Sequence, residues 1–134
     1  MRVAAVTGLS GSGKTTLLES LIRRYVALGL RVAAIKHTHH AVNEGEGGDT
    51  GRFRACGADP VIFAGSGEAI LFPSRRRVCF VIPAELLEHA GSADVVLVEG
   101  FRSFTGWPQI RLSAGSWLTE EEAATMLDRI WNRS

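Results

Sequence analysis

The chain has 134 residues, 46% of them hydrophobic, which is enough to bury the core of one compact domain, and we expect residues 1–134 to form one. Its 15 basic and 14 acidic side chains give a formal net charge of +1, so there is no general positive field to hold a nucleic-acid backbone or an anionic membrane surface. The two cysteines form no CxxC pattern and no apolar run approaches the ~20 residues that span a bilayer, so we expect a cytoplasmic protein without a disulfide framework or a zinc ribbon.

Short apolar runs alternate with segments of helical periodicity along the chain. In chain order they predict a strand at 2–7, a helix at 15–28, a strand at 31–36, a short helix at 50–56, a strand at 61–64, a hairpin of 69–72 with 78–82, a short helix at 83–90, strands at 94–99 and 109–112, and a helix at 119–131. Thr119 and Glu122 have the spacing of a capping box for the last helix. Such alternation favours an α/β fold of three α/β/α layers, with a mainly parallel, mixed sheet that carries an antiparallel hairpin at one edge.

The stretch from the first strand to the first helix has the strongest functional signal. Residues 8–15 read GLSGSGKT and fit the pattern GxxxxGK[ST] between an apolar strand and an amphipathic helix, which predicts a P-loop. Glycines allow successive backbone N–H groups to curl around a phosphate, and the start of the helix adds partial positive charge. The residues expected to cradle the phosphates are Gly8, Ser10, Gly11, Ser12, Gly13, Lys14, Thr15 and Thr16.

The two lysines of the chain are themselves informative. Every other basic side chain, apart from the histidines, is arginine, so lysine is kept only at Lys14 and Lys36. A compact, mobile ammonium suits a phosphate cradle better than a planar guanidinium does. We therefore expect Lys14 to reach the outer phosphates as a catalytic group, and Lys36 to act at the same site.

An acidic residue lies at each end of the predicted strand at 94–99. Five steps of ~3.3 Å separate Asp94 from Glu99 by about 16 Å, so only one of them can lie near the phosphates. Ligands of open α/β sheets bind beyond the carboxyl ends of the parallel strands, which favours Glu99. We expect Glu99 and the Thr15 hydroxyl to hold Mg²⁺, with Glu99 also a candidate to orient a nucleophile, and Asp94 to cap a neighbouring segment at the far end.

A histidine-rich segment follows the second predicted strand. His37, His39 and His40 come directly after Lys36 or close to it, at the same edge of the sheet as the P-loop. Contacts to phosphate or substrate are favoured over a zinc site, because no cysteine accompanies these histidines at ligand spacing. Asp49 fits the N-cap of the next helix, and Arg52 could reach the nucleotide or an anionic substrate.

Taken together, the motifs resemble the MobB family of molybdopterin-guanine dinucleotide biosynthesis adaptor proteins. The resemblance covers residues 2–112 in order and is carried by the P-loop, IKHTHH, DT-x-R-x-R followed by CGAD, DVVLVEGFRSF and WPQIRL. It implies a P-loop NTPase fold, binding of GTP and Mg²⁺, slow or partner-dependent GTP hydrolysis, frequent homodimers, and cooperation with the guanylyltransferase that acts on the molybdopterin cofactor. Carried over, residues 8–16 bind the phosphates, Glu99 belongs to the VEG motif, and Lys36 to His40 with Asp49 and Arg52 face them.

Two features of the chain limit what the resemblance implies. Gly48 stands where the family usually has a lysine, and the segment after Leu112 passes almost directly into the last predicted helix. Both lysines are already assigned, so no NKxD-type guanine-recognition motif exists, and the choice of GTP over ATP rests on the resemblance. A P-loop small-molecule kinase or ATP-dependent ligase is the alternative, with its second substrate at residues 37–54.

Overall fold

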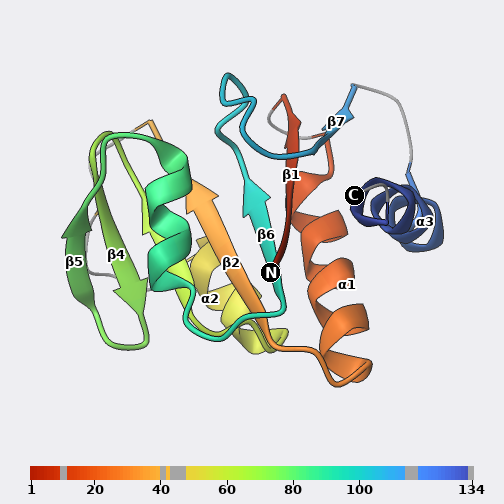
Figure 1. Cartoon of the computed structure of the whole chain (residues 1–134), viewed down its shortest axis with the longest axis horizontal. Coiled ribbons are helices and arrows are strands. Elements are labelled where there is room, and N and C mark those ends of the chain that lie inside the picture. Colours follow the sequence, from red (N-terminus) through yellow and green to blue (C-terminus); the bar gives the residue numbers. More distant parts are fainter. Residues whose placement is uncertain (10–11, 40–41, 43–47, 114–117, 133–134) are drawn as a thin grey trace.

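The computed structural model describes residues 1–9, 12–39, 42, 48–113 and 118–132. Its strands form one seven-stranded sheet in the order β5-β4-β3-β2-β6-β1-β7 (Figure 1). The strands are β1 (Arg2–Gly8), β2 (Val32–His37), β3 (Val61–Ala64), β4 (Glu68–Phe72), β5 (Arg76–Cys79), β6 (Val95–Glu99) and β7 (Gln109–Leu112). The helices are α1 (Lys14–Ala27), α2 (Gly48–Ala55), α3 (Glu120–Trp131) and the 3₁₀ helix η1 (Pro83–His89).

Strands β1, β6 and β2 form the centre of the sheet and run parallel. Their segments are nearly continuous apolar runs, as expected for strands covered on both faces. The register aligns Val6 with Glu99 across β1 and β6, and Lys36 with Glu99 across β2 and β6. Since parallel strands end at the same edge, this register brings the start of the P-loop, the carboxylate of β6 and the lysine of β2 together.

Helices cover both faces of the sheet. One core joins α1, α2 and α3 to alternate strand residues such as Val6 and Leu97, whereas the other joins η1 to the intervening residues such as Ala5 and Val98. This alternation is the period of two that strands impose on their side chains. The predicted three-layer α/β/α arrangement with a mainly parallel, mixed sheet is confirmed, because among the described strands four pairs are parallel and two, β3 with β4 and β4 with β5, are antiparallel.

The last helix is capped at its start and bonded to β1 at its end. Thr119 accepts a hydrogen bond from the Glu122 amide at 3.1 Å, and the Glu122 carboxylate accepts one from the Thr119 amide at 3.3 Å, so the predicted capping box is confirmed. At the other end, the Trp131 indole donates to the Val3 carbonyl at 3.0 Å. Among the described residues, no helix has the length and apolar character needed to cross a bilayer.

The second strand of the hairpin differs from the prediction. It was expected at 78–82, but β5 begins at Arg76 and ends at Cys79, and Val81 and Ile82 are 88% and 51% exposed. Arg76 and Arg77 pair with β4 and so belong to the strand, and the Arg77 side chain forms an ion pair with Glu68 on β4. The apolar side chains at 81 and 82 suggested a strand, but the strand ends at Cys79 and η1 begins at Pro83.

Candidate functional site

The described part of the P-loop connects β1 to α1. Gly8 has φ of 150°, and a Cβ placed there would lie 2.5 Å from the Leu112 carbonyl oxygen, so no larger residue fits between β1 and β7. Gly13 has φ of 91° and caps α1, and the Ser12 amide donates to the Leu9 carbonyl at 3.1 Å. Ser10 and Gly11, which we also predicted to contact phosphate, lie outside the described residues.

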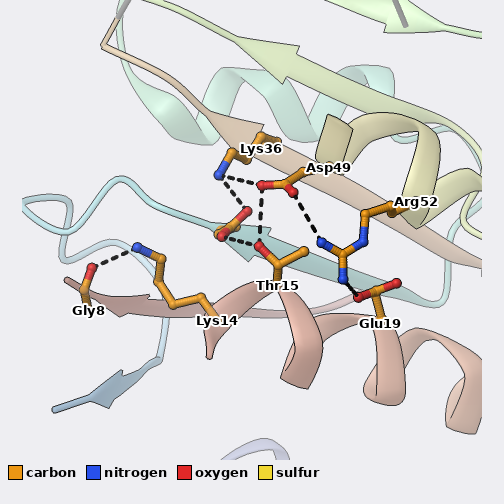
Figure 2. Close-up of polar contacts among 8 residues, drawn as sticks. Gly8, Lys14, Thr15, Glu19, Lys36, Asp49 and Arg52 are labelled. Carbon is orange, nitrogen blue, oxygen red and sulfur yellow. Dashed lines mark hydrogen bonds and ion pairs between the residues drawn. The ribbon is translucent and has the colours of Figure 1, made fainter. Parts of the chain in front are cut away.

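Lys14, the first residue of α1, folds back over the loop. Its Nζ donates to the Gly8 carbonyl oxygen at 2.8 Å (Figure 2). The ammonium is therefore held beside the opening of the loop, at the helix N-terminus where an anion is stabilised by the free amides and the helix dipole.

Four polar side chains meet beside the start of α1 (Figure 2). The Thr15 hydroxyl lies 2.9 Å from Glu99 Oε1 and 3.2 Å from Asp49 Oδ2, and its single proton can be donated to only one of them at a time. Lys36 Nζ lies 2.7 Å from Glu99 Oε2 and 2.9 Å from Asp49 Oδ2. Glu99 is 2% exposed, so the cluster holds a buried carboxylate at the end of β6.

The charges in this cluster stabilise one another. Burial by itself lowers the pKa of Lys36, but its hydrogen bonds and attraction to Glu99 and Asp49 outweigh burial and raise that pKa above 10.5. Burial alone raises the pKa of Asp49, but Lys36 and Thr15 hold it below 3.8. At neutral pH Lys36 is therefore an ammonium and Asp49 a carboxylate.

The donor atoms of the cluster suit a hard divalent cation. Two carboxylates and a threonine hydroxyl converge on a cleft of about 390 Å³ lined by Gly13, Lys14, Thr15, Thr16, Lys36, Asp49 and Glu99. Mg²⁺ prefers oxygen ligands and is commonly held by one or two carboxylates together with water and phosphate oxygens. The residues present fit Mg²⁺: Thr15 and Glu99 stay the predicted ligands, and Asp49 is an additional candidate.

Asp49 and Asp94 were both predicted to cap neighbouring segments, and the structure confirms this for Asp94 alone. Asp49 was expected to be an N-cap, but α2 begins at Gly48, and the Asp49 side chain is directed to Lys36 and Thr15 instead. Asp94 lies at the opposite end of the sheet, where its Oδ2 accepts a hydrogen bond from the Arg31 amide at 2.8 Å. The predicted capping role of Asp94 is confirmed.

Arg52 lies beside Asp49, at the side of the cluster next to Glu19. It pairs with Glu19 of α1, and one guanidinium nitrogen lies 3.8 Å from Asp49 Oδ1 (Figure 2). It lines neither of the two clefts at this edge of the sheet. The structure therefore shows Arg52 joining α2 to α1, and its contact with a nucleotide or an anionic substrate stays a prediction.

A larger cleft of about 790 Å³ adjoins the cluster. Its walls are formed by residues 7–9, 36–39 and 99–104, with Lys14 and Pro83. His37 and His39 contribute one wall, with ring centroids 4.9 Å apart, whereas His40 lies outside the described residues. Burial, together with the charges of His39 and Lys36, lowers the pKa of His37 below 6.5, so its ring is neutral at pH 7. Among the described residues, no three His, Cys, Asp or Glu side chains are grouped to hold a metal ion.

A second wall of this cleft comes from the loop after β6, which packs directly against His37 and for which the sequence predicted no role. Gly100 has φ of 104°, and a Cβ there would lie 2.8 Å from His37 Cβ. Phe101, at a positive φ of 54°, stacks on His37 with centroids 4.0 Å apart. Arg102 lines the same cleft, and Thr7 Oγ1 is buried beside it with no hydrogen-bond partner among the described residues. The one feature of the sequence that could have indicated this wall is the FRSF at residues 101–104, directly after the VEG motif.

The GxxxxGKT loop between a central parallel strand and a helix, facing a buried carboxylate on the adjacent strand, defines a P-loop NTPase. Comparison with known proteins identifies the family within that class. Residues 3–129 match the family described as MobB, molybdopterin guanine dinucleotide synthesis protein B, and the chain belongs to it.

Named relatives agree with this family. The chain is 41% identical over 99 residues to the molybdopterin-guanine dinucleotide biosynthesis adapter protein of Haemophilus influenzae, and 35% identical over 102 residues to that of Escherichia coli. These matches cover 72% and 73% of the chain but only 55% and 58% of the relatives, so the chain spans little more than half of their length. The crystal structure of Bacillus subtilis MobB is similar with a TM-score of 0.53 and 26% identity, over 94% of this chain and 73% of that one.

Proposed function

We propose that the chain binds GTP and Mg²⁺ through its P-loop and serves as an adapter in the synthesis of molybdopterin guanine dinucleotide. The observation that supports this most strongly is the convergence of Thr15, Asp49 and Glu99 oxygens beside Lys14 at the start of α1. A P-loop NTPase places its phosphates and metal ion in this position relative to the strand and the helix.

Each residue of the site has a role in this proposal. Residues 8–16 surround the phosphates, and Lys14 exchanges the Gly8 carbonyl for an outer phosphate oxygen. Thr15 and Glu99 hold Mg²⁺, with Asp49 close enough to bind it directly or through water. The metal ion, when bound, neutralises charge on the phosphates. His37 and His39 line the cleft beyond Lys14 and face the terminal phosphate or a second anionic ligand.

Hydrolysis by the chain alone should be slow. No glutamine lines the described walls of either cleft, so the side chain that orients the attacking water in other P-loop proteins has no counterpart there. An arginine supplied by a partner accelerates such reactions by about 10³–10⁵. We further propose a cytoplasmic homodimer whose turnover depends on a guanylyltransferase partner that carries the molybdopterin cofactor. The names of its relatives support the adapter part of this proposal.

Calorimetric titration with GTP and with ATP, each with and without Mg²⁺, tests this proposal. We expect GTP to bind more tightly than ATP, Mg²⁺ to strengthen binding, and product release over the same period to be negligible. Equal or tighter binding of ATP would contradict the GTP assignment, and heat without saturation for both nucleotides would contradict nucleotide binding altogether.

The larger cleft favours one second candidate, a P-loop kinase or ligase. It adjoins Lys14 and is large enough, at about 790 Å³, for a small acceptor molecule. In that case ATP would bind more tightly than GTP, and phosphoryl transfer to an added acceptor would exceed hydrolysis. The same titration therefore separates the two functions.

A further inference from the structure

The position of Lys36 suggests a role beyond contact with phosphate. Its ammonium lies between Asp49 and Glu99, at 2.9 and 2.7 Å from their carboxylates, and the Thr15 hydroxyl touches the same two side chains. These three residues are the ones that fit Mg²⁺. The ammonium therefore occupies the polar centre into which a divalent cation would have to bind.

An ammonium and a divalent cation cannot share this centre favourably. Two positive ions a few ångströms apart repel strongly where water is partly excluded, and Glu99 is almost fully buried. A lone Glu99 carboxylate at this depth, without Lys36 or a metal ion, would also be unfavourable. One cation at a time is thus the stable occupancy of the cluster.

The Lys36 ammonium has a second possible position, in the larger cleft. Among the described residues that line the two clefts, Lys14, Lys36 and Glu99 line both, so Lys36 borders the larger cleft as well. Lysine has a flexible four-carbon stem and three donors, so its ammonium can be redirected by rotation of side-chain bonds. In the larger cleft it would meet an anion that lies beyond Lys14, such as a terminal phosphate.

We propose that Lys36 is an internal counter-ion, which holds Asp49 and Glu99 in position while the metal ion is absent and is displaced from them when a divalent cation and a polyphosphate bind together. This inference rests on the proposed function and specifies how the same site is controlled. Lys36 is then a positioning residue: it opposes binding of metal ion alone and favours joint binding, because only the phosphate offers its ammonium a new partner.

A purely structural role for the Lys36 ion pairs would have different effects on stability and metal affinity. If Lys36 only joins β2 to α2 and β6, its replacement should lower stability and leave metal affinity unchanged or weaker. The counter-ion role predicts stronger binding of a metal ion in the absence of nucleotide. Metal affinity without nucleotide is therefore the measurement that separates the two.

The experiment is a titration of the nucleotide-free protein with Mn²⁺ alone, followed by the electron paramagnetic resonance signal of free Mn²⁺. Lys36→Met should bind Mn²⁺ at least about tenfold more tightly than the wild type, because one repelling charge is gone. Arg52→Met is the charge-matched control, since Arg52 also lies beside Asp49 but 3.8 Å from its other oxygen, and should change affinity by less than about threefold. Lys36→Arg should remain close to the wild type.

Each outcome decides the inference. Equal or weaker Mn²⁺ binding by Lys36→Met, or an equal gain in Arg52→Met, overturns it. If Lys36→Met does not fold, Lys36→Gln replaces it in the same titration. If the wild type binds GTP with Mg²⁺ but Lys36→Met gains no Mn²⁺ affinity, the counter-ion role alone has failed. If Lys36→Met gains Mn²⁺ affinity but the wild type binds no nucleotide, the proposed function has failed instead.

A second measurement follows the two lysines of the wild type directly. The chain has two lysines, so ¹³Cε-lysine labelling gives two side-chain signals, which Lys14→Arg assigns. Addition of Mg²⁺ with a non-hydrolysable GTP analogue should shift the Lys36 signal as its ammonium leaves the carboxylates. A Lys36 signal that stays in place while the Lys14 signal shifts would overturn the displacement.

Discussion

The two lysines, which sequence reasoning singled out together, have contrasting partners. Lys14 bonds to the carbonyl of Gly8, whereas Lys36 pairs with two carboxylates. Their shared edge of the sheet could be predicted, because Lys36 lies at the carboxyl end of one parallel strand and Lys14 follows another. The pairing of Lys36 with Asp49 could not, since it depends on how α2 packs against α1 and β2. The roles of these residues in binding remain predictions.

Lys14→Ala is the most direct test at the scale of single residues. In wild-type protein, GTP with Mg²⁺ at about 100 times its dissociation constant should stabilise the fold by about 2.7 kcal/mol. Lys14→Ala should show almost none of this stabilisation in thermal denaturation, because the ammonium that balances the outer phosphates is missing.

Asp94→Ala serves as its control. Asp94 is at the opposite end of β6 and contacts the Arg31 amide, so this variant should keep the nucleotide-dependent stabilisation. Loss of the Mg²⁺ dependence in Asp94→Ala, together with its retention in Glu99→Ala, would contradict the assignment of the site to the carboxyl end of β6.

Among the elements, α1 and α3 were predicted closely and β5 was not. The helices have strong periodic and capping signals, and α1 begins within one residue of its predicted start. The hairpin has a three-arginine segment that is typical of a solvated turn, yet two of these arginines belong to β5. Pairing with β4 decided this boundary, and such long-range pairing is not visible in local sequence.

The capping box of α3 gives a prediction for that helix. Thr119→Ala removes the side-chain oxygen that accepts from the Glu122 amide, and should lower the free energy of unfolding by about 1 kcal/mol in urea denaturation. Thr105→Ala, at an exposed loop position, is the matched control and should change stability by less than about 0.5 kcal/mol. Equal effects of the two substitutions would show that the cap does not contribute.

Tyr25 connects α1 to α3 and gives a prediction on pH dependence. Its ring packs on Trp131, its hydroxyl is buried without a partner among the described residues, and burial raises its pKa to about 12. The raised pKa means that its contribution to stability is complete below pH 10 and is lost as pH rises from 10 towards 12.

Tyr25→Phe should therefore resist alkaline unfolding. By pH 11 the wild type should have lost about 1.4 kcal/mol relative to Tyr25→Phe, whereas at pH 7 the variant should be at least as stable as the wild type. The chain has one tyrosine, so absorbance at alkaline pH reports its ionisation in the folded protein directly. Identical pH profiles for the two proteins would contradict the burial argument.

At the scale of the whole molecule, the site results from the register of three parallel strands. The pairing of Val6 and of Lys36 with Glu99 places residues from distant parts of the sequence at one edge. The class of fold and this edge could be predicted, because apolar strands alternate with helices and ligands bind at the carboxyl ends of the strands. The order of the strands and the wall at residues 100–104 required the structure, since loop conformations such as the positive φ of Phe101 have no clear local signal.

We propose above all that a polyphosphate and a divalent ion bind between β1 and α1. A crystal structure with Mg²⁺ and a non-hydrolysable GTP analogue tests it most directly. We predict phosphate density along the loop before α1, Lys14 Nζ on a phosphate oxygen instead of the Gly8 carbonyl, and a metal ion on Thr15 and Glu99. An analogue bound elsewhere, with Lys14 still on Gly8 and Lys36 still between its carboxylates, would contradict the account.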